Sequence, residues 1–158
     1  MKYERPVSVC DGSATDLAGE IVAALSATSM VFKEDRDYSK RLVQAAESLF
    51  VAIPTKQGTY TLVDACGKQA RMLYNSTSYQ DELAWGATWL FLATENTNYL
   101  ATATETFFSA KSNEPSVDKG VVYWNNKLNA VEVTSIDTHT EFSGEFVFNL
   151  IFDLCRFC

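Results

Sequence analysis

Residues 79–90, Tyr-Gln-Asp-Glu-Leu-Ala-Trp-Gly-Ala-Thr-Trp-Leu, constrain the fold more than any other stretch of this chain. Five of these residues recur at spacings of three and four, which places them on one face of an α-helix: Glu82, Trp85, Gly86, Trp89 and Leu90. Glycine inside a helix costs roughly 1 kcal/mol relative to alanine. Gly86 is therefore expected to mark a point where a neighbouring backbone packs closely against this helix.

The start of this helix carries hydroxyl and carboxyl groups suited to a helix N-terminus. Thr77 or Ser78 is predicted to cap it, because a hydroxyl oxygen can accept hydrogen bonds from the free N–H groups of the first turn. Asp81 and Glu82 then lie near the positive end of the helix dipole. Adjacent residues point about 100° apart on a helix, so these two are not expected to form a facing catalytic pair.

Three more segments have helical periodicity, at about residues 14–32, 38–52 and 98–110. Ser13 to Asp16 resembles a capping box, and Pro54 is expected to end the second helix. With the helix at about 78–94, these segments predict two antiparallel helical hairpins and an all-α fold.

The segments between and after these helices are less regular. Residues 59–63 are expected to form a short strand-like piece within the connection 55–76. The pattern weakens from Leu128 onward, and 131–135 is a poor helix former. Core positions are predicted for six aromatic residues: Tyr38, Trp85, Trp89, Tyr99, Phe107 and Phe108.

Length and composition indicate one globular domain. The chain has 158 residues, of which 47% are hydrophobic and 21% charged. The net charge of −7 and the lack of a basic patch argue against a nucleic-acid partner. Residues 1–6 do not resemble a signal peptide and no apolar run is long enough to span a bilayer, so no membrane partner is expected and the localisation stays open.

The sequence offers no pattern for a metal or cofactor. The four cysteines permit two disulfides but show no framework, and Cys155-Arg-Phe-Cys158 lacks the second pair of ligands that a zinc site needs. These two are expected to be incidental thiols. His139, the single histidine, is expected to be a surface residue or a helix cap. We therefore expect no metal site and no cofactor.

Several motifs together resemble one enzyme family. Residues 76–90 resemble the Tyr-Gln-Asp-Glu-Leu-x-Trp-Gly-Ala-x-Trp-Leu segment of glycoside hydrolase family 9, the plant-type endo-β-1,4-glucanases or cellulases. Other matches follow in the same order: Glu4-Arg5-Pro6, the Ala-rich stretch 13–32, and Tyr123-Trp124-Asn125-Asn126-Lys127. The resemblance covers about residues 4–130.

The resemblance implies an (α/α)6 barrel of helical hairpins. This chain supplies five or six helices, so we expect a partial (α/α)6 barrel, an arc rather than the whole. Residues 1–158 then form a single incomplete catalytic domain, with 131–158 as a divergent tail. Helix faces that the rest of the barrel would cover are candidates for self-association.

The family's catalytic motifs are not matched. Its water-activating aspartates lie in Asp-Ala-Gly-Asp before the Glu-Arg-Pro point, and its acid glutamate lies near its C-terminus. Asp64-Ala65-Cys66-Gly67 lacks the final aspartate and lies in the wrong place. We therefore assign no catalytic residue and expect the chain alone to be inactive.

Sugar-binding residues are carried over by position. Aromatic rings stack on glucose rings while polar groups take the hydroxyls. The resemblance places Tyr79 and Trp124 in the glucan cleft, with Asn125 where the family more often has aspartate. The predicted partner is a β-1,4-glucan or cello-oligosaccharide, bound weakly.

Two further readings stay open. The alternative function is a non-enzymatic helical module that binds a protein partner through its uncovered helix faces. Separately, Asn75-Ser76-Thr77 is a glycosylation sequon, which matters only in a secreted chain.

Overall fold

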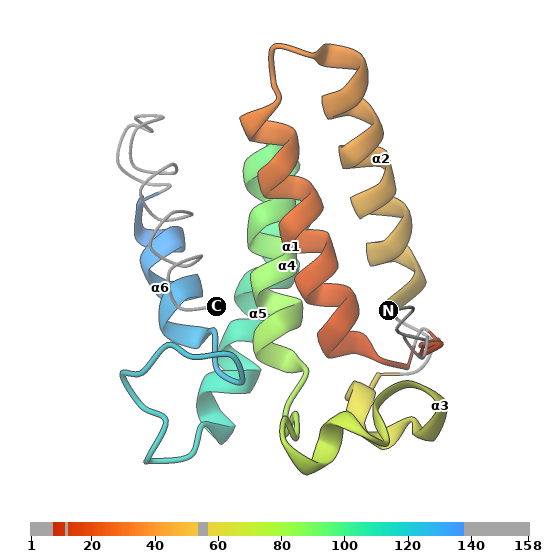
Figure 1. Ribbon diagram of the computed structural model, residues 1–158. Helices are drawn as coiled ribbons and strands as arrows, with labels where there is room; N and C mark the ends of the chain where they lie inside the picture. The colour runs from red at the N-terminus through yellow and green to blue at the C-terminus, as the bar shows by residue number, and fades with distance from the viewer. Residues whose placement is uncertain (1–7, 12, 54–56, 138–158) are drawn as a thin grey trace.

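The computed structural model describes residues 8–11, 13–53 and 57–137 (Figure 1). Its long helices are α1 (Thr15–Val31), α2 (Arg36–Ala52), α4 (Gln80–Thr94), α5 (Thr97–Asn113) and α6 (Leu128–Asp137). Short turns lie between α2 and α4: η2 (Tyr60–Leu62), α3 (Asp64–Gly67) and η3 (Ala70–Met72). The described residues contain no strand, only an isolated bridge between Tyr123 and Asn126, so the all-α prediction is confirmed.

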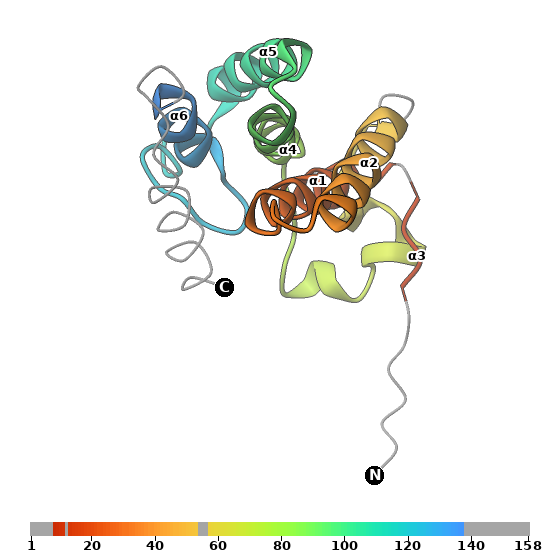
Figure 2. The same cartoon turned by 90° about the horizontal axis from the view of Figure 1, so that it is seen from above.

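Helix α4 is the centre of the arrangement. Seen from above, it lies between α1 and α5, with α2 beside α1 and α6 at the side (Figure 2). Ten consecutive residues of α4, from 81 to 90, are buried. No helix of the described part is both long and apolar enough to cross a membrane.

The backbones of α1 and α4 touch at two glycines. A methyl group on Gly86 would lie 2.8 Å from the carbonyl oxygen of Gly19, and one on Gly19 would lie 2.7 Å from the carbonyl carbon of Glu82. Both distances are too short for any real side chain. The close approach predicted for Gly86 is confirmed, and we call this contact the α1–α4 seam.

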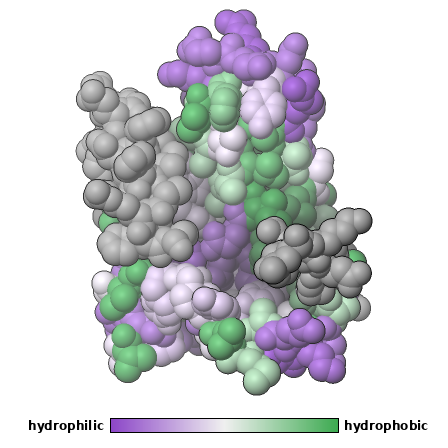
Figure 3. Space-filling model, in the orientation of Figure 1, coloured by the Kyte–Doolittle hydropathy of each residue, from purple (hydrophilic) through white to green (hydrophobic). Residues whose placement is uncertain are grey.

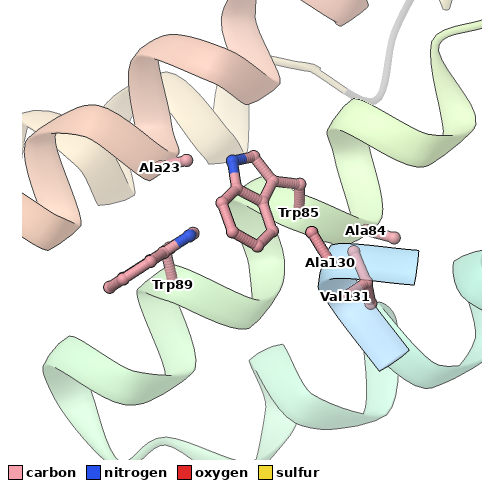
Figure 4. Packing of buried hydrophobic residues seen from close by; sticks show 6 residues of the cluster. All are labelled: Ala23, Ala84, Trp85, Trp89, Ala130 and Val131. Atoms are coloured by element: carbon pink, nitrogen blue, oxygen red, sulfur yellow. The ribbon is translucent and has the colours of Figure 1, made fainter. Parts of the chain in front are cut away.

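Two tryptophans of α4 form the main apolar cluster. Trp85 and Trp89 meet edge to face at 5.4 Å and lie between α1 and α6, against Ala23, Ala130 and Val131 (Figure 4). Their predicted core positions are confirmed.

The other aromatic predictions have mixed outcomes. Tyr99 packs edge to face on Phe50, and Phe107 packs on the tryptophan cluster, both partly buried. Phe108 is 66% exposed and Tyr38 36% exposed, so both core predictions are wrong. Phe108 follows Phe107 directly, and a step of about 100° turns it away from the core.

Helix α6 forms despite its β-branched sequence. Val131 and Thr134 are buried, and Val131 packs with the α4 tryptophans. The low intrinsic helix propensity of 131–135 is overridden by this burial, since packing of one face supplies most helix stability in proteins. Predictions for residues 138–158, including Cys155, Cys158 and His139, lie outside the described residues.

Residues 57–79 and 114–127 form a layer at the lower end of the helices in Figure 1, which we call the loop layer. Residues 60–62 are a 3-10 turn, so the strand-like prediction for 59–63 is wrong. The predicted capping box at Ser13–Asp16 is also wrong. Ala14 is the N-cap, and Asp16 instead accepts a 2.8 Å hydrogen bond from the backbone N–H of Tyr60 in the loop layer.

A disulfide ties the start of the chain to the loop layer. Cys10 is bonded to Cys66 of α3, 56 residues away in sequence. The even cysteine count permitted this pairing, but the spacing of the cysteines did not indicate it.

Candidate functional site

A hollow of about 450 Å³ lies where the start of α4 faces the end of α5 and the start of α6. Most of the residues that line it have polar side chains: Thr77, Ser78, Tyr79, Gln80, Asp81, Ala110, Asn113, Glu114, Pro115, Asp118, Asn125, Asn126 and Leu128. Two of the three predicted sugar-binding residues, Tyr79 and Asn125, are in this lining. The third, Trp124, is outside the lining but adjoins Asn125 in the chain.

Trp124 presents an indole to solvent. It is 47% exposed, whereas the other two tryptophans of the chain are buried. Its ring meets Tyr74 edge to face at 5.6 Å and Tyr123 at 6.5 Å. Edge contacts from two tyrosines orient the indole, and an oriented, exposed ring can stack on the apolar face of a sugar.

The side chain of Asn125 joins the two halves of the loop layer. Its Oδ1 accepts a 3.1 Å hydrogen bond from the backbone N–H of Thr77, and its Nδ2 donates a 2.8 Å bond to the Thr77 hydroxyl. An aspartate here could accept the first of these bonds but could not donate the second. Asn125 thus holds residue 77 beside the hollow, and spare lone pairs on its oxygen leave it able to accept from a ligand hydroxyl.

Lys127 and Asp81 fix the 123–127 segment on the helices. The backbone N–H of Lys127 donates to Asp81 Oδ2 at 3.1 Å, and its Nζ donates to the Trp124 carbonyl at 2.6 Å. The same ammonium pairs with Glu20 of α1 at 2.8 Å. The position of Trp124 therefore depends on charged groups from α1 and α4.

Asn126 and Tyr123 connect the same segment to the 114–118 turn. Asn126 Nδ2 donates to Glu114 Oε1 and to the carbonyl of Asp118, each at 3.0 Å. The Tyr123 hydroxyl donates to Asp118 Oδ1 at 2.9 Å. These bonds hold two carboxylates of the hollow in fixed places.

The carboxyl groups around the site differ in protonation. Burial and the neighbouring Asp81 raise the pKa of Glu82 to about 9, so Glu82 is neutral at pH 7. Burial alone would raise the pKa of Glu114, but hydrogen bonds from Asn126 and Lys111 outweigh it and hold that pKa below its usual value. Glu114 is therefore an ionised acceptor at the hollow, suited to hydroxyl groups rather than to donating a proton.

The network around Trp124 was only partly predictable. The sequence motifs indicated Tyr79, Trp124 and Asn125, while Asp81 was expected to serve the helix dipole and to accept hydrogen bonds. Glu114, Asp118 and Lys127 were missed as parts of the site. A clue was available for Lys127, which ends the Trp-Asn-Asn-Lys motif, but none for the other two. Among the described residues, no group of three or more histidine, cysteine, aspartate or glutamate side chains could hold a metal ion.

The helices that pack around α4, with no strand among the described residues, define the class of all-α proteins built from helical hairpins. The family model of glycosyl hydrolase family 9 matches residues 1–149. The chain belongs to glycosyl hydrolase family 9.

Individual relatives agree with this assignment. The chain is 42% identical to Endoglucanase 21 of Arabidopsis thaliana over 130 residues, and this match covers 80% of the chain and 20% of the relative. It is 39% identical over 134 residues to Endoglucanase 10 of Oryza sativa subsp. japonica, covering 83% of the chain and 21% of the relative. The chain thus spans about a fifth of the length of the curated relatives it matches.

Solved structures show the same fold. The endoglucanase from the termite Nasutitermes takasagoensis superposes with a TM-score of 0.76 at 35% identity, over 89% of this chain and 31% of that one. A cellulase of C. cellulolyticum superposes with a TM-score of 0.66 at 24% identity, over 89% of this chain and 30% of the other. The described helices therefore form an arc of the (α/α)6 barrel. The family match extends beyond residue 130, where the sequence motifs had faded, while the divergence of residues 131–158 stays a prediction.

Proposed function

We propose that this chain forms one wall of a β-1,4-glucan cleft and binds cello-oligosaccharides weakly through Tyr79, Trp124 and Asn125. The observation that carries the proposal is the exposed, oriented indole of Trp124, which precedes Asn125 in the chain, while Asn125 and Tyr79 line the hollow. An aromatic face beside fixed hydrogen-bonding groups is the arrangement that recognises a sugar ring. Support comes from the relatives named endoglucanases and cellulase.

We propose that the chain alone does not hydrolyse the glucan. Glycoside hydrolysis needs a carboxylic acid to protonate the leaving oxygen and a second carboxylate across the scissile bond. At this hollow Glu114 has a lowered pKa, and Glu82, which has a raised one, is buried and outside the lining. The family's catalytic motifs also have no match in the sequence.

The test is a titration of the full chain with cellohexaose, followed by tryptophan fluorescence and by calorimetry. We expect a saturable signal that is lost in Trp124→Ala and weakened in Tyr79→Ala. Phe108→Ala is the control, because it removes another exposed aromatic ring, on the α5 surface. Cellohexaose heat that is the same in Trp124→Ala as in the parent chain would refute the assignment.

Hydrolysis is measured in the same preparation. Incubation with soluble cellulose is expected to release no reducing ends above the buffer control. Release by the purified chain, abolished by Glu114→Gln, would contradict the proposed inactivity and place a catalytic carboxyl at the hollow.

A second candidate function is protein binding through the outer face of α1 and α2. Leu17 and Ile21 are exposed there, beside a mainly apolar groove of about 220 Å³ that Leu49 and Ile53 also line. Figure 3 shows hydrophobic side chains gathered over these two helices. Sedimentation decides between the two candidates: a dimer broken by Ile21→Glu, with no response to sugar, would favour the protein-binding module.

A further inference from the structure

The segment that carries the Asn75-Ser76-Thr77 sequon lies on the surface of the loop layer. Residues 72–75 are all exposed, and Asn75 lies between the 3-10 turn η3 and the first residue of α4. The sequence contains no second Asn-x-Ser/Thr sequon. A sequon in an exposed loop is the position where a glycan can be carried without disturbing packing.

The disulfide supplies an independent observation about the compartment. Cys10 and Cys66 are bonded, and such bonds form and persist in secreted proteins and in the lumen of the endoplasmic reticulum. Asparagine-linked glycans are attached in that same lumen. In a eukaryotic cell, a chain that acquires this disulfide in the lumen therefore also meets the enzyme that reads sequons.

The chemistry of the neighbouring residues also favours a glycan. Met72 and Leu73 are 86% and 82% exposed, and Tyr74 is exposed beside them. Three consecutive exposed apolar residues favour association between molecules. A bulky, hydrophilic glycan on the next residue would shield them from other chains.

Folding does not block the modification. In the folded chain the Thr77 hydroxyl accepts a hydrogen bond from Asn125, but Asn125 is made 48 residues after Thr77. Attachment during synthesis therefore precedes this contact. The side chain of Asn75 itself stays at the surface after folding.

We propose that Asn75 is an N-glycosylation site, modified when the chain enters the secretory pathway. The proposal is independent of sugar binding at the hollow, because it rests on the exposure of the sequon and on the Cys10–Cys66 bond.

The test is cell-free translation of the full chain behind a cleavable secretory leader, in the presence of microsomes. We expect one endoglycosidase-sensitive mobility shift, retained in Thr77→Ser and lost in both Asn75→Gln and Thr77→Ala. Mass spectrometry of the peptide that contains Asn75 should locate the glycan.

The control is Pro115→Thr, which completes a second sequon at the exposed Asn113. The Pro115→Thr chain is expected to show the mobility shift of two glycans, and Pro115→Thr combined with Asn75→Gln the shift of one. A single shift in Pro115→Thr that survives Asn75→Gln would show that the lumenal enzyme is active on this chain but passes over Asn75, and the proposal would be overturned.

Discussion

The α1–α4 seam and the loop layer lie next to each other but are held together in different ways. At the seam two glycines bring the helix backbones into contact, and the flanking side chains are buried. In the loop layer, hydrogen bonds join segments far apart in sequence: Asn125 accepts from the backbone of Thr77, and Asp81 of α4 accepts from the backbone of Lys127. The seam depends on the absence of side chains, whereas the loop layer depends on particular functional groups.

This difference separates stability from binding. A seam of small residues tolerates almost no added volume, since interiors are close-packed. Each exposed hydrogen bond of the loop layer contributes less to stability, but together these bonds hold Trp124 and the residues of the hollow in position. Changes at the seam should therefore lower the stability of the fold. Changes in the loop layer should alter ligand binding with a smaller loss of stability, except at the disulfide that joins this layer to the start of the chain.

Loss of the Cys10–Cys66 disulfide is expected to have the largest effect on the free energy of unfolding. Cys10→Ser releases a loop closed across 56 residues and should lower the free energy of unfolding by about 4 kcal/mol. Urea unfolding with and without reductant measures it. The double change Cys155→Ser and Cys158→Ser serves as the control, and equal midpoints for Cys10→Ser and the parent chain under oxidising conditions would rule out the bond.

A methyl group added at the α1–α4 seam should cause the next largest loss of stability. Gly19→Ala places Cβ against the Glu82 carbonyl group, so α1 and α4 must separate, at an expected cost of about 2–3 kcal/mol. Ala24→Gly, on the exposed side of α1, should cost only about 1 kcal/mol through helix propensity. The comparison is read from thermal melts, and a Gly19→Ala variant as stable as the parent would mean that the helices are not in backbone contact.

Glu82 makes the stability of the seam depend on pH. Its pKa is raised from 4.5 to about 9 by burial and by Asp81, so the folded chain holds this proton more tightly than the unfolded chain. Stability is then greatest below about pH 4.5 and falls as the pH rises towards about 9, with a slope of up to about 1.4 kcal/mol per pH unit.

Glu82→Gln should flatten this slope, because glutamine stays neutral at every pH. Burial also raises the pKa of Asp16, which leaves a residual slope of the same sign. Urea unfolding at about pH 5 and about pH 8 measures the change. Glu105→Gln on the exposed side of α5 is the control, and an unchanged slope in Glu82→Gln would show that Glu82 is ionised in the folded chain.

The smallest effect on stability is expected in the loop layer. Asn125→Ala removes two partly exposed hydrogen bonds to Thr77 and should cost about 1 kcal/mol. The same substitution should weaken cellohexaose binding more than it weakens folding, because residue 77 beside the hollow is then no longer held in place. Asn98→Ala is the matched control on α5, and equal affinities in the two variants would show that Asn125 neither binds nor positions the site.

The sequence by itself determined four of the long helices, α1, α2, α4 and α5, and the presence of a close backbone contact at Gly86. Residues 80–94 form the expected helix, with Trp85, Gly86 and Trp89 at helical spacing. The propensity cost of Gly86 pointed to a close backbone contact, which α1 supplies. The bounds of α1, α2 and α5 follow from the same local periodicity and differ from the expected ones by at most three residues. Of the three residues that the motifs indicated, Tyr79 and Asn125 line one hollow and Trp124 is outside its lining, while their binding of sugar stays a prediction.

Tertiary structure decided whatever depends on distant partners. Helix α6 forms because Val131 is buried with Trp85 and Trp89, although its own sequence disfavours helix. Folding brings the loop layer next to the start of α1. Cys10 can then form a disulfide with Cys66, and Asp16 accepts a hydrogen bond from the backbone of Tyr60 instead of serving in a capping box. Local propensity contains no information about such contacts, since their free energy appears only when both partners are in place.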